Sequence, residues 1–139
     1  AIFTKYQSLS DATWKAHEKI DFQFEITDTI SPKNMFINIR NNSQYEFSNL
    51  FVITALEFPS GTKVVDTLHY EMADGTGQFL GQGFTEIKEN KLFYKEQKLF
   101  PESGEYYFSI YQAMRKNGAI EPIAALKGIQ DVGISIENY

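Results

Sequence analysis

Seven consecutive residues in the first quarter of the chain alternate strictly between apolar and polar side chains. The apolar set is Ile20, Phe22, Phe24 and Ile26, and the polar residues stand between them. Successive side chains of a β-strand point to opposite faces, so this pattern predicts a strand with one buried and one solvated face. It is the cleanest periodicity in the chain, and it favours a fold built from sheets.

Other runs with strand character follow, separated by turn signals such as the Pro-Ser-Gly at residues 59–61. The run at residues 50–58 is nearly continuously apolar, which predicts a central strand covered on both faces. Residues 105–114 carry apolar or aromatic groups on both faces and predict an interior strand. The remaining expected strands are residues 2–6, 35–40, 63–72, 86–96 and 129–136.

About eight strands spaced by turns are typical of an antiparallel all-β sandwich or barrel. We expect an all-β fold over residues 1–139, a single antiparallel β-sandwich domain of jelly-roll or immunoglobulin-like type. Residues 1–19 are expected to form an N-terminal strand and loop segment, with a helical turn that Ser10 or Asp11 caps.

Charge and composition narrow the range of partners. The net charge is −5 and the pI is about 5.0, whereas nucleic-acid binders carry a basic surface, so we expect no nucleic-acid partner. The sequence has no cysteine, which rules out disulfides and thiolate-ligated metals within these residues. No run approaches the roughly 18 apolar residues that a membrane-spanning helix needs.

A glycine-rich stretch, DGTGQFLGQGF at residues 74–84, lies between two expected strands. It lacks the lysine of a phosphate-binding loop, and its spacing differs from the dinucleotide fingerprint, with no helix pattern after it. The favoured interpretation is a structural crossover in which glycines allow positive φ and close backbone approach. In the alternative, Phe79 is presented there to a partner, and Phe84 flanks the glycines on the other side.

Catalytic and metal motifs are weak. His17 and His69 have no spacing relation, and no Gly-x-Ser-x-Gly occurs. Asp66, Glu71 and Asp74 supply oxygen ligands of the kind calcium uses, without the dense Asp/Asn alternation of a loop site. A carboxylate pair for glycoside hydrolysis stays open, because the fold sets its separation. We expect no enzymatic activity, no metal ion and no cofactor.

Aromatic side chains are the remaining candidates for contacts with a partner, although most large rings in a β-sandwich belong to its core. Exposed rings on such a fold stack on sugars or anchor protein partners. The candidate partner contacts are Trp14, Phe79, Phe93, Tyr94 and Arg115.

Successive blocks over residues 35–137 resemble one known family. They are INIRNNSQYEFSNLFV (37–52), FPSG followed by DTLHYEMAD (58–74), FLGQGF (79–84), IKENKLFYKE (87–96), FPESGEYYFSI with QAMRKNG (100–118) and GIQDVGISIE (128–137). In this order they are similar to the gliding-motility lipoprotein family GldH of Bacteroidetes, with YQSL (6–9) and Trp14 continuing the resemblance. Phe93 stands where many relatives are expected to have Trp.

The resemblance implies a non-catalytic lipoprotein of the cell envelope, a binding or scaffold component of the gliding-motility and associated secretion machinery. Its partners would be other envelope or motility-complex proteins. The membrane would be reached through a lipidated Cys just upstream of Ala1, with the domain facing the periplasm. The family brings no catalytic residues with it. The alternative function is a carbohydrate-binding β-sandwich module, for which a glycan is the partner.

Overall fold

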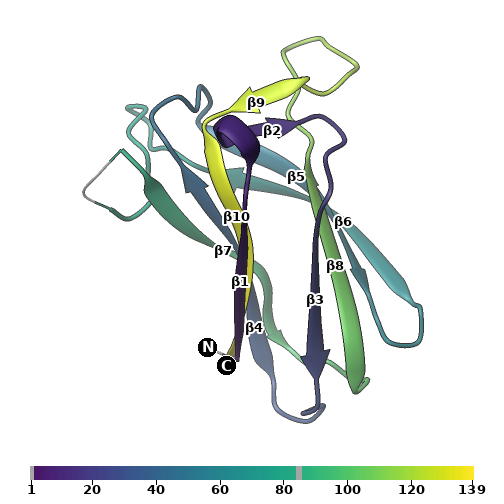
Figure 1. Ribbon diagram of the computed structural model, residues 1–139. Helices are drawn as coiled ribbons and strands as arrows, with labels where there is room; N and C mark the ends of the chain where they lie inside the picture. The colour runs from purple at the N-terminus through teal and green to yellow at the C-terminus, as the bar shows by residue number, and fades with distance from the viewer. Residues whose placement is uncertain (1, 84–85) are drawn as a thin grey trace.

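Most of the chain forms two four-stranded antiparallel sheets that pack face to face (Figure 1). The computed structural model describes residues 2–83 and 86–139. One sheet has the order β1-β10-β4-β7 and the other β3-β8-β5-β6, while the short strands β2 and β9 pair at one end. The strands are β1 (Phe3–Ser8), β2 (Thr13–Lys15), β3 (Ile20–Ile26), β4 (Lys33–Asn41), β5 (Asn49–Glu57), β6 (Lys63–Glu71), β7 (Lys88–Lys98), β8 (Gly104–Gln112), β9 (Ala125–Lys127) and β10 (Ile129–Asn138).

The strand order identifies the type of sandwich. If the three-residue strands β2 and β9 are left out, the other eight strands can be renumbered 1 to 8 in chain order. The two sheets then have the strand orders 1-8-3-6 and 2-7-4-5. This is the order of a jelly roll, in which the chain passes repeatedly between two sheets. The all-β sandwich prediction is therefore confirmed, and the jelly roll replaces the immunoglobulin-like alternative.

The N-terminal segment combines a strand with a tight turn. β1 pairs antiparallel with β10, and a 3₁₀ turn, Ser10–Ala12, follows it. The predicted helical turn is thus present, but its N-cap is Leu9 and no side chain caps it. Capping by Ser10 or Asp11 was a wrong expectation, because the turn is too short to leave a row of free amides.

The alternating run forms β3, with the predicted bounds and faces. Its four apolar side chains are buried, and its polar ones are exposed. β3 pairs with β8 along its whole length, so that Phe24 lies opposite Tyr106 and the two rings stack 5.4 Å apart. Rings from both strands fill the space between the sheets, as aromatic pairs do in a close-packed core.

The apolar run at residues 50–58 forms β5 between β8 and β6, so its central position is confirmed. Its coverage on both faces was a wrong expectation. Buried and half-buried residues alternate along β5, and the half-buried set, including Phe51 and Ile53, lies on the outer face of its sheet. β8 likewise has an exposed outer face. The apolar character of the outer residues therefore needs an explanation other than core packing.

The glycine-rich stretch carries the chain from β6 in one sheet to β7 in the other, which confirms the predicted crossover for its described part. The Asp74 carboxylate closes a turn by accepting hydrogen bonds from the Thr76 amide and hydroxyl and from the Gln78 amide. These bonds, that of the Thr76 hydroxyl first, hold the pKa of Asp74 below its usual value. A Cβ on Gly81 would come within 2.8 Å of Lys88, so only glycine fits there. Phe84 lies outside the described residues.

A buried lysine closes the turn between β3 and β4. Lys33 is only 2% exposed, and its ammonium donates to the carbonyls of Asp28 and Ser31 at 2.8 and 3.0 Å. The Asp28 carboxylate lies 3.7 Å from the same ammonium and also accepts the amides of Ile30 and Ser31. These amides, Ser31 first, lower the pKa of Asp28 from 3.8 to about 2.

This shift predicts a pH-dependent contribution of Asp28 to stability. A carboxyl whose pKa is lower in the folded state stabilises the fold above its unfolded pKa. That contribution is lost as the pH falls towards about 2. We expect Asp28→Asn to be less stable than the wild type at pH 5, and the gap to close between about pH 4 and pH 2. Urea denaturation across this range measures the gap, and a gap that does not change with pH would contradict the assignment.

Candidate recognition surface

The two outer faces of the sandwich differ in how far their side chains form hydrogen bonds and ion pairs with one another. The outer face of the β1-β10-β4-β7 sheet, named here the paired face, carries polar side chains that bond to one another. Arg40 lies between Glu89 and Asp131, 3.6 Å from each carboxylate, and 3.8 Å above the Tyr6 ring. The Tyr6 hydroxyl donates to Glu89 at 2.8 Å. Burial and then this carboxylate raise the pKa of Tyr6 to about 12, so the hydroxyl stays a donor.

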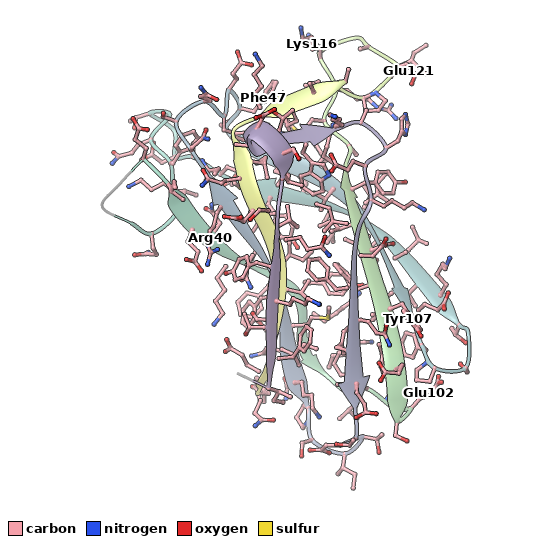
Figure 2. The ribbon with its side chains drawn as sticks, viewed as in Figure 1. Arg40, Phe47, Glu102, Tyr107, Lys116 and Glu121 are labelled. Atoms are coloured by element: carbon pink, nitrogen blue, oxygen red, sulfur yellow. The ribbon has the colours of Figure 1, made fainter. Side chains whose placement is uncertain are left out.

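The outer face of the β3-β8-β5-β6 sheet, named here the open face, is different. Its middle carries Ile53 and Ala55 from β5, Val65 from β6 and two tyrosines, Tyr107 and Tyr111, from β8. Val65 is 61% exposed and Tyr107 47% exposed. Figure 2 shows Tyr107 and Arg40 on opposite sides of the sandwich. The chain thus leaves several rings and branched side chains unpacked together on this face, a feature that marks interaction surfaces.

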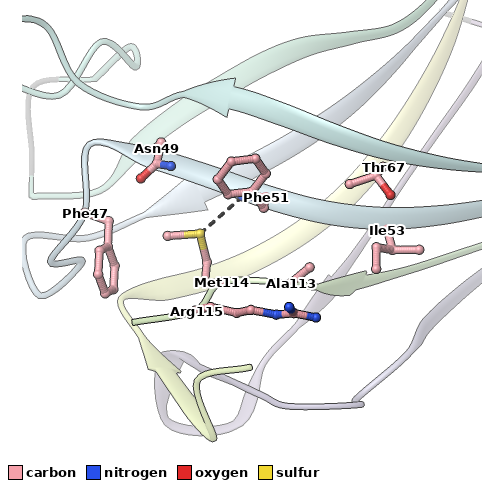
Figure 3. A pocket seen from close by; sticks show the side chains of 8 residues that line it. All are labelled: Phe47, Asn49, Phe51, Ile53, Thr67, Ala113, Met114 and Arg115. Atoms are coloured by element: carbon pink, nitrogen blue, oxygen red, sulfur yellow. Dashed lines mark hydrogen bonds between the residues drawn. The ribbon is translucent and has the colours of Figure 1, made fainter. Parts of the chain in front are cut away.

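A pocket of about 460 Å³ indents the open face near the β2–β9 end. Figure 3 shows the eight residues around it, which come from β5, β6, the segment before β5 and the segment after β8. Its size lies within the range of ligand-binding pockets in proteins. It is lined by Phe47, Asn49, Phe51, Ile53, Thr67, Ala113, Met114 and Arg115.

The segment after β8 is anchored under this pocket by one buried side chain. Gln112 accepts the Met114 amide at 2.9 Å and donates to the Ile123 carbonyl at 2.8 Å, so it ties both ends of the intervening loop. Ile123 also donates its amide to the Met114 carbonyl. Met114 then folds inward, and its sulfur accepts the Phe51 amide at 3.2 Å (Figure 3). The pocket floor is therefore fixed, although its thioether remains adaptable.

Charge is distributed unevenly along the open face. Of the residues that the structure describes, Arg115 is the one charged residue in the lining of the pocket. At the other end of the face, Glu25 and Glu105 lie directly opposite each other on β3 and β8. Like charges in that position are unfavourable, and Gln23 offsets them in part by donating a 3.0 Å hydrogen bond to Glu105. Glu25 and Glu105 therefore lie at the end of the face away from the pocket, while Glu71 lies opposite the pocket residue Asn49.

Two of the five predicted contact residues belong to the core. Trp14 is fully buried under the β2–β9 pair, and its indole N–H donates to the Glu18 carbonyl at 3.0 Å. Tyr94 is buried between the sheets with its ring 5.1 Å from that of Phe108. Both rings are packed inside the domain, where their apolar volume helps to fill the core.

The other three lie at separate places. Arg115 is exposed at the pocket rim. Phe79 is half-buried against Tyr45, 6.4 Å away between ring centroids, so it points inward to the loops beside the pocket. Phe93 is 52% exposed on the paired face, where it covers Phe36. The structure therefore does not bring the five residues together, and only Arg115 lines the open face.

The pocket residues Phe47, Phe51 and Met114 were not among the residues predicted from the sequence. The sequence did contain one indication of this surface, because the run at residues 50–58, which includes Phe51, is apolar on both of its faces. A second layer of the sandwich covers one face alone, so the apolar residues on the other face form a surface. No comparable signal marked Met114, because its position depends on the hydrogen bonds of Gln112.

Other kinds of site find little support in the described residues. Within residues 2–83 and 86–139, no three His, Cys, Asp or Glu side chains gather as metal ligands do. Asp66, one of the carboxylates considered for calcium, is paired with Lys95 at 3.2 Å. Over the same residues, no helix is long and apolar enough to cross a membrane.

The chain is similar to proteins of one family. The model of the GldH lipoprotein family matches residues 1–136. A gliding motility lipoprotein GldH homolog of Christiangramia forsetii is 46% identical over 136 residues, which are 98% of this chain and 83% of that protein. The gliding motility lipoprotein GldH of Flavobacterium johnsoniae is 45% identical, over 98% of this chain and 84% of its own.

Solved structures resemble the chain only distantly. The VP2 subviral particle of infectious bursal disease virus aligns with 97% of this chain and 33% of the viral one, at a TM-score of 0.42 and 12% identity. The Gx strain of the same virus gives 97% and 32%, a TM-score of 0.43 and 7% identity. At this level of similarity neither fold nor function transfers.

Proposed function

The chain belongs to the GldH lipoprotein family, and on that premise we propose that it is a membrane-anchored lipoprotein of the cell envelope that binds a component of the gliding-motility machinery. It acts as a binding or scaffold protein without catalysis. The relatives are named for gliding motility, and the family model covers almost the whole chain.

The contrast between the two outer faces carries this proposal. On the paired face, the charged groups around Arg40 are bonded to one another, so a partner would have to break those bonds to gain new ones. On the open face, Val65 and Tyr107 are exposed and can be buried by a partner without such a loss. Burial of apolar surface is the main favourable term in most protein association.

The position of the chain ends suggests how the domain is oriented relative to the membrane. Both ends lie together at the end of the sandwich opposite the β2–β9 pair (Figure 1). A lipid attached on the N-terminal side would place that end towards the membrane. The pocket, which adjoins the other end, would then point away from the bilayer, towards proteins on the periplasmic side.

The proposal predicts that open-face residues, rather than paired-face residues, hold the partner. We expect Tyr107→Ala combined with Tyr111→Ala to lower the yield of crosslinked partner from envelope fractions at least about fivefold, since truncating a central tyrosine commonly costs over 1 kcal/mol. The lipidated protein is used, and quantitative mass spectrometry measures the yield.

Phe93→Ala is the matched control, because Phe93 is exposed to nearly the same extent as Tyr107 on the other face. We expect the control to keep the partner and all variants to keep their melting temperatures within a few degrees. Loss of the partner with Phe93→Ala alone would move the recognition surface to the paired face. Retention by every variant would contradict a role for either outer face, and a glycan-array signal from the open face in place of a captured protein would favour the carbohydrate-binding alternative.

A further inference from the structure

The pocket on the open face has a definite chemical character. Five of its eight lining residues are apolar, and the two neutral polar ones are Asn49 and Thr67. No acidic side chain lines it, although the chain as a whole carries a net charge of −5. The apolar lining selects an apolar group, and the few polar groups decide its orientation.

Arg115 stands at the rim with its guanidinium free to bind. Among residues 2–83 and 86–139, no carboxylate forms an ion pair with it, in contrast to Arg40, which has two such partners. In Figure 3 its side chain extends along the pocket from the segment that also carries Met114. A guanidinium presents its donors in a planar fork that matches a carboxylate, so the unpaired group favours an anionic ligand.

A second, smaller depression of about 180 Å³ continues from the first and shares Ile53, Ala113 and Arg115 with it. Arg115 therefore stands between two neighbouring hollows, and Tyr111 lines the second one. A ligand that fills both must be elongated, with its negative charge near the middle. A peptide in extended conformation has this shape, because every second side chain faces the same surface and can enter successive pockets.

We propose that this site binds an extended acidic peptide segment of a partner protein, with an apolar side chain in the larger hollow and, on Arg115, the carboxylate of an acidic residue two positions away on the same face of the peptide. The inference rests on the proposed binding function and names the class of ligand. The carboxylates at the far end of the open face, Glu25 and Glu105, disfavour the same segment there. The phenyl groups of Phe47 and Phe51 and the thioether of Met114 form the apolar wall.

The test uses the peptide Gly-Asp-Ser-Phe-Ser-Asp-amide, labelled with fluorescein on its N-terminal amine, and its neutral analogue with Asn in place of both Asp residues. Fluorescence anisotropy measures the affinity of each for the purified protein. We expect the acidic peptide to bind about tenfold more tightly than the neutral one, and Arg115→Gln to remove about the same factor, as for a hydrogen bond to a charged group. Raising the salt concentration should weaken the acidic peptide only.

The chain provides internal controls. Lys116→Gln removes the neighbouring positive charge, which does not line this pocket, and should leave the affinity nearly unchanged. The methyl resonance of Met114 should shift on binding, whereas those of the buried Met35 and Met72, which lie outside the pocket, should not. NMR of the three methionine methyls therefore locates the peptide.

Three outcomes would overturn the inference: equal affinity for the two peptides, no effect of Arg115→Gln, or binding of dodecanoate but not the peptide at the Met114 methyl. The crosslinking experiment distinguishes failure of the peptide inference from failure of the proposed function. If Tyr107→Ala alone loses the partner while Arg115→Gln retains it, the open face still binds, but not through this site, because Tyr107 lines neither hollow.

Discussion

Gly128→Ala is expected to destabilise the fold by at least about 4 kcal/mol, a size that single substitutions reach only through a few identifiable mechanisms. Gly128 has a φ of +93°, and a Cβ there would lie 2.3 Å from the Tyr45 amide nitrogen and 2.6 Å from the Tyr45 Cα. Both atoms belong to the backbone, which cannot move aside as a flexible side chain can. The left-handed conformation adds about 1–2 kcal/mol for any residue with a Cβ.

The same backbone unit connects three parts of the chain. The Gly128 amide donates to the Ala12 carbonyl at 2.8 Å, and its carbonyl accepts the Asn42 amide at 2.9 Å. Relief of the clash at Tyr45 would therefore stretch both hydrogen bonds. Because a domain's total stability is about 5–15 kcal/mol, a loss of this size leaves the variant close to unfolding.

Gly118→Ala is the matched control for this prediction. Gly118 also has a positive φ, +80°, but no atom lies within 4 Å of its would-be Cβ. We expect only the conformational cost of about 1–2 kcal/mol there. Urea denaturation followed by circular dichroism measures both variants, and equal losses would show that conformation, rather than the contact with Tyr45, limits position 128.

Trp14→Ala is the second large effect, with an expected loss of about 3–5 kcal/mol and a fall in melting temperature on the order of 10 °C. The fully buried ring supports the β2–β9 pair, and its N–H satisfies the Glu18 carbonyl. Alanine leaves a cavity and also an unpaired carbonyl.

Trp14→Phe separates these two contributions. Phenylalanine keeps most of the apolar volume but not the N–H donor, so we expect a smaller loss of about 1–2 kcal/mol. Differential scanning calorimetry avoids the use of the single tryptophan as a reporter. A normal melting temperature for Trp14→Ala together with loss of the partner would restore Trp14 as a contact residue and contradict its place in the core.

The elements predicted correctly from the sequence are those whose structure depends on neighbouring residues. The bounds and faces of β3 were predicted correctly, because period-two alternation directly reports which side of a strand is buried. The alternation of apolar and polar residues could not decide between a jelly roll and an immunoglobulin-like sandwich. It depends on pairings such as Phe3 with Ile136, which join the two ends of the chain.

The candidate site was harder to predict than the fold. Arg115 was among the predicted contacts, and the structure places it at the pocket rim. Trp14 and Tyr94 were selected as aromatic residues in polar surroundings, and both are buried. Sequence neighbours do not report burial in a jelly roll, because the covering layer comes from distant strands. β2 and β9, which enclose Trp14, are separated by most of the chain.

The pairing of β1 with β10 sets how the molecule would carry a mechanical load. A partner held near the β2–β9 end and a membrane anchor on the N-terminal side would pull β1 along its own length (Figure 1). β1 pairs with β10 from Phe3 to Ser8, and all of these residue pairs lie across the direction of pull. Such a load shears the whole strand pair at once instead of peeling it open one hydrogen bond at a time. This jelly roll would therefore resist tension best along the axis from its anchor to its pocket.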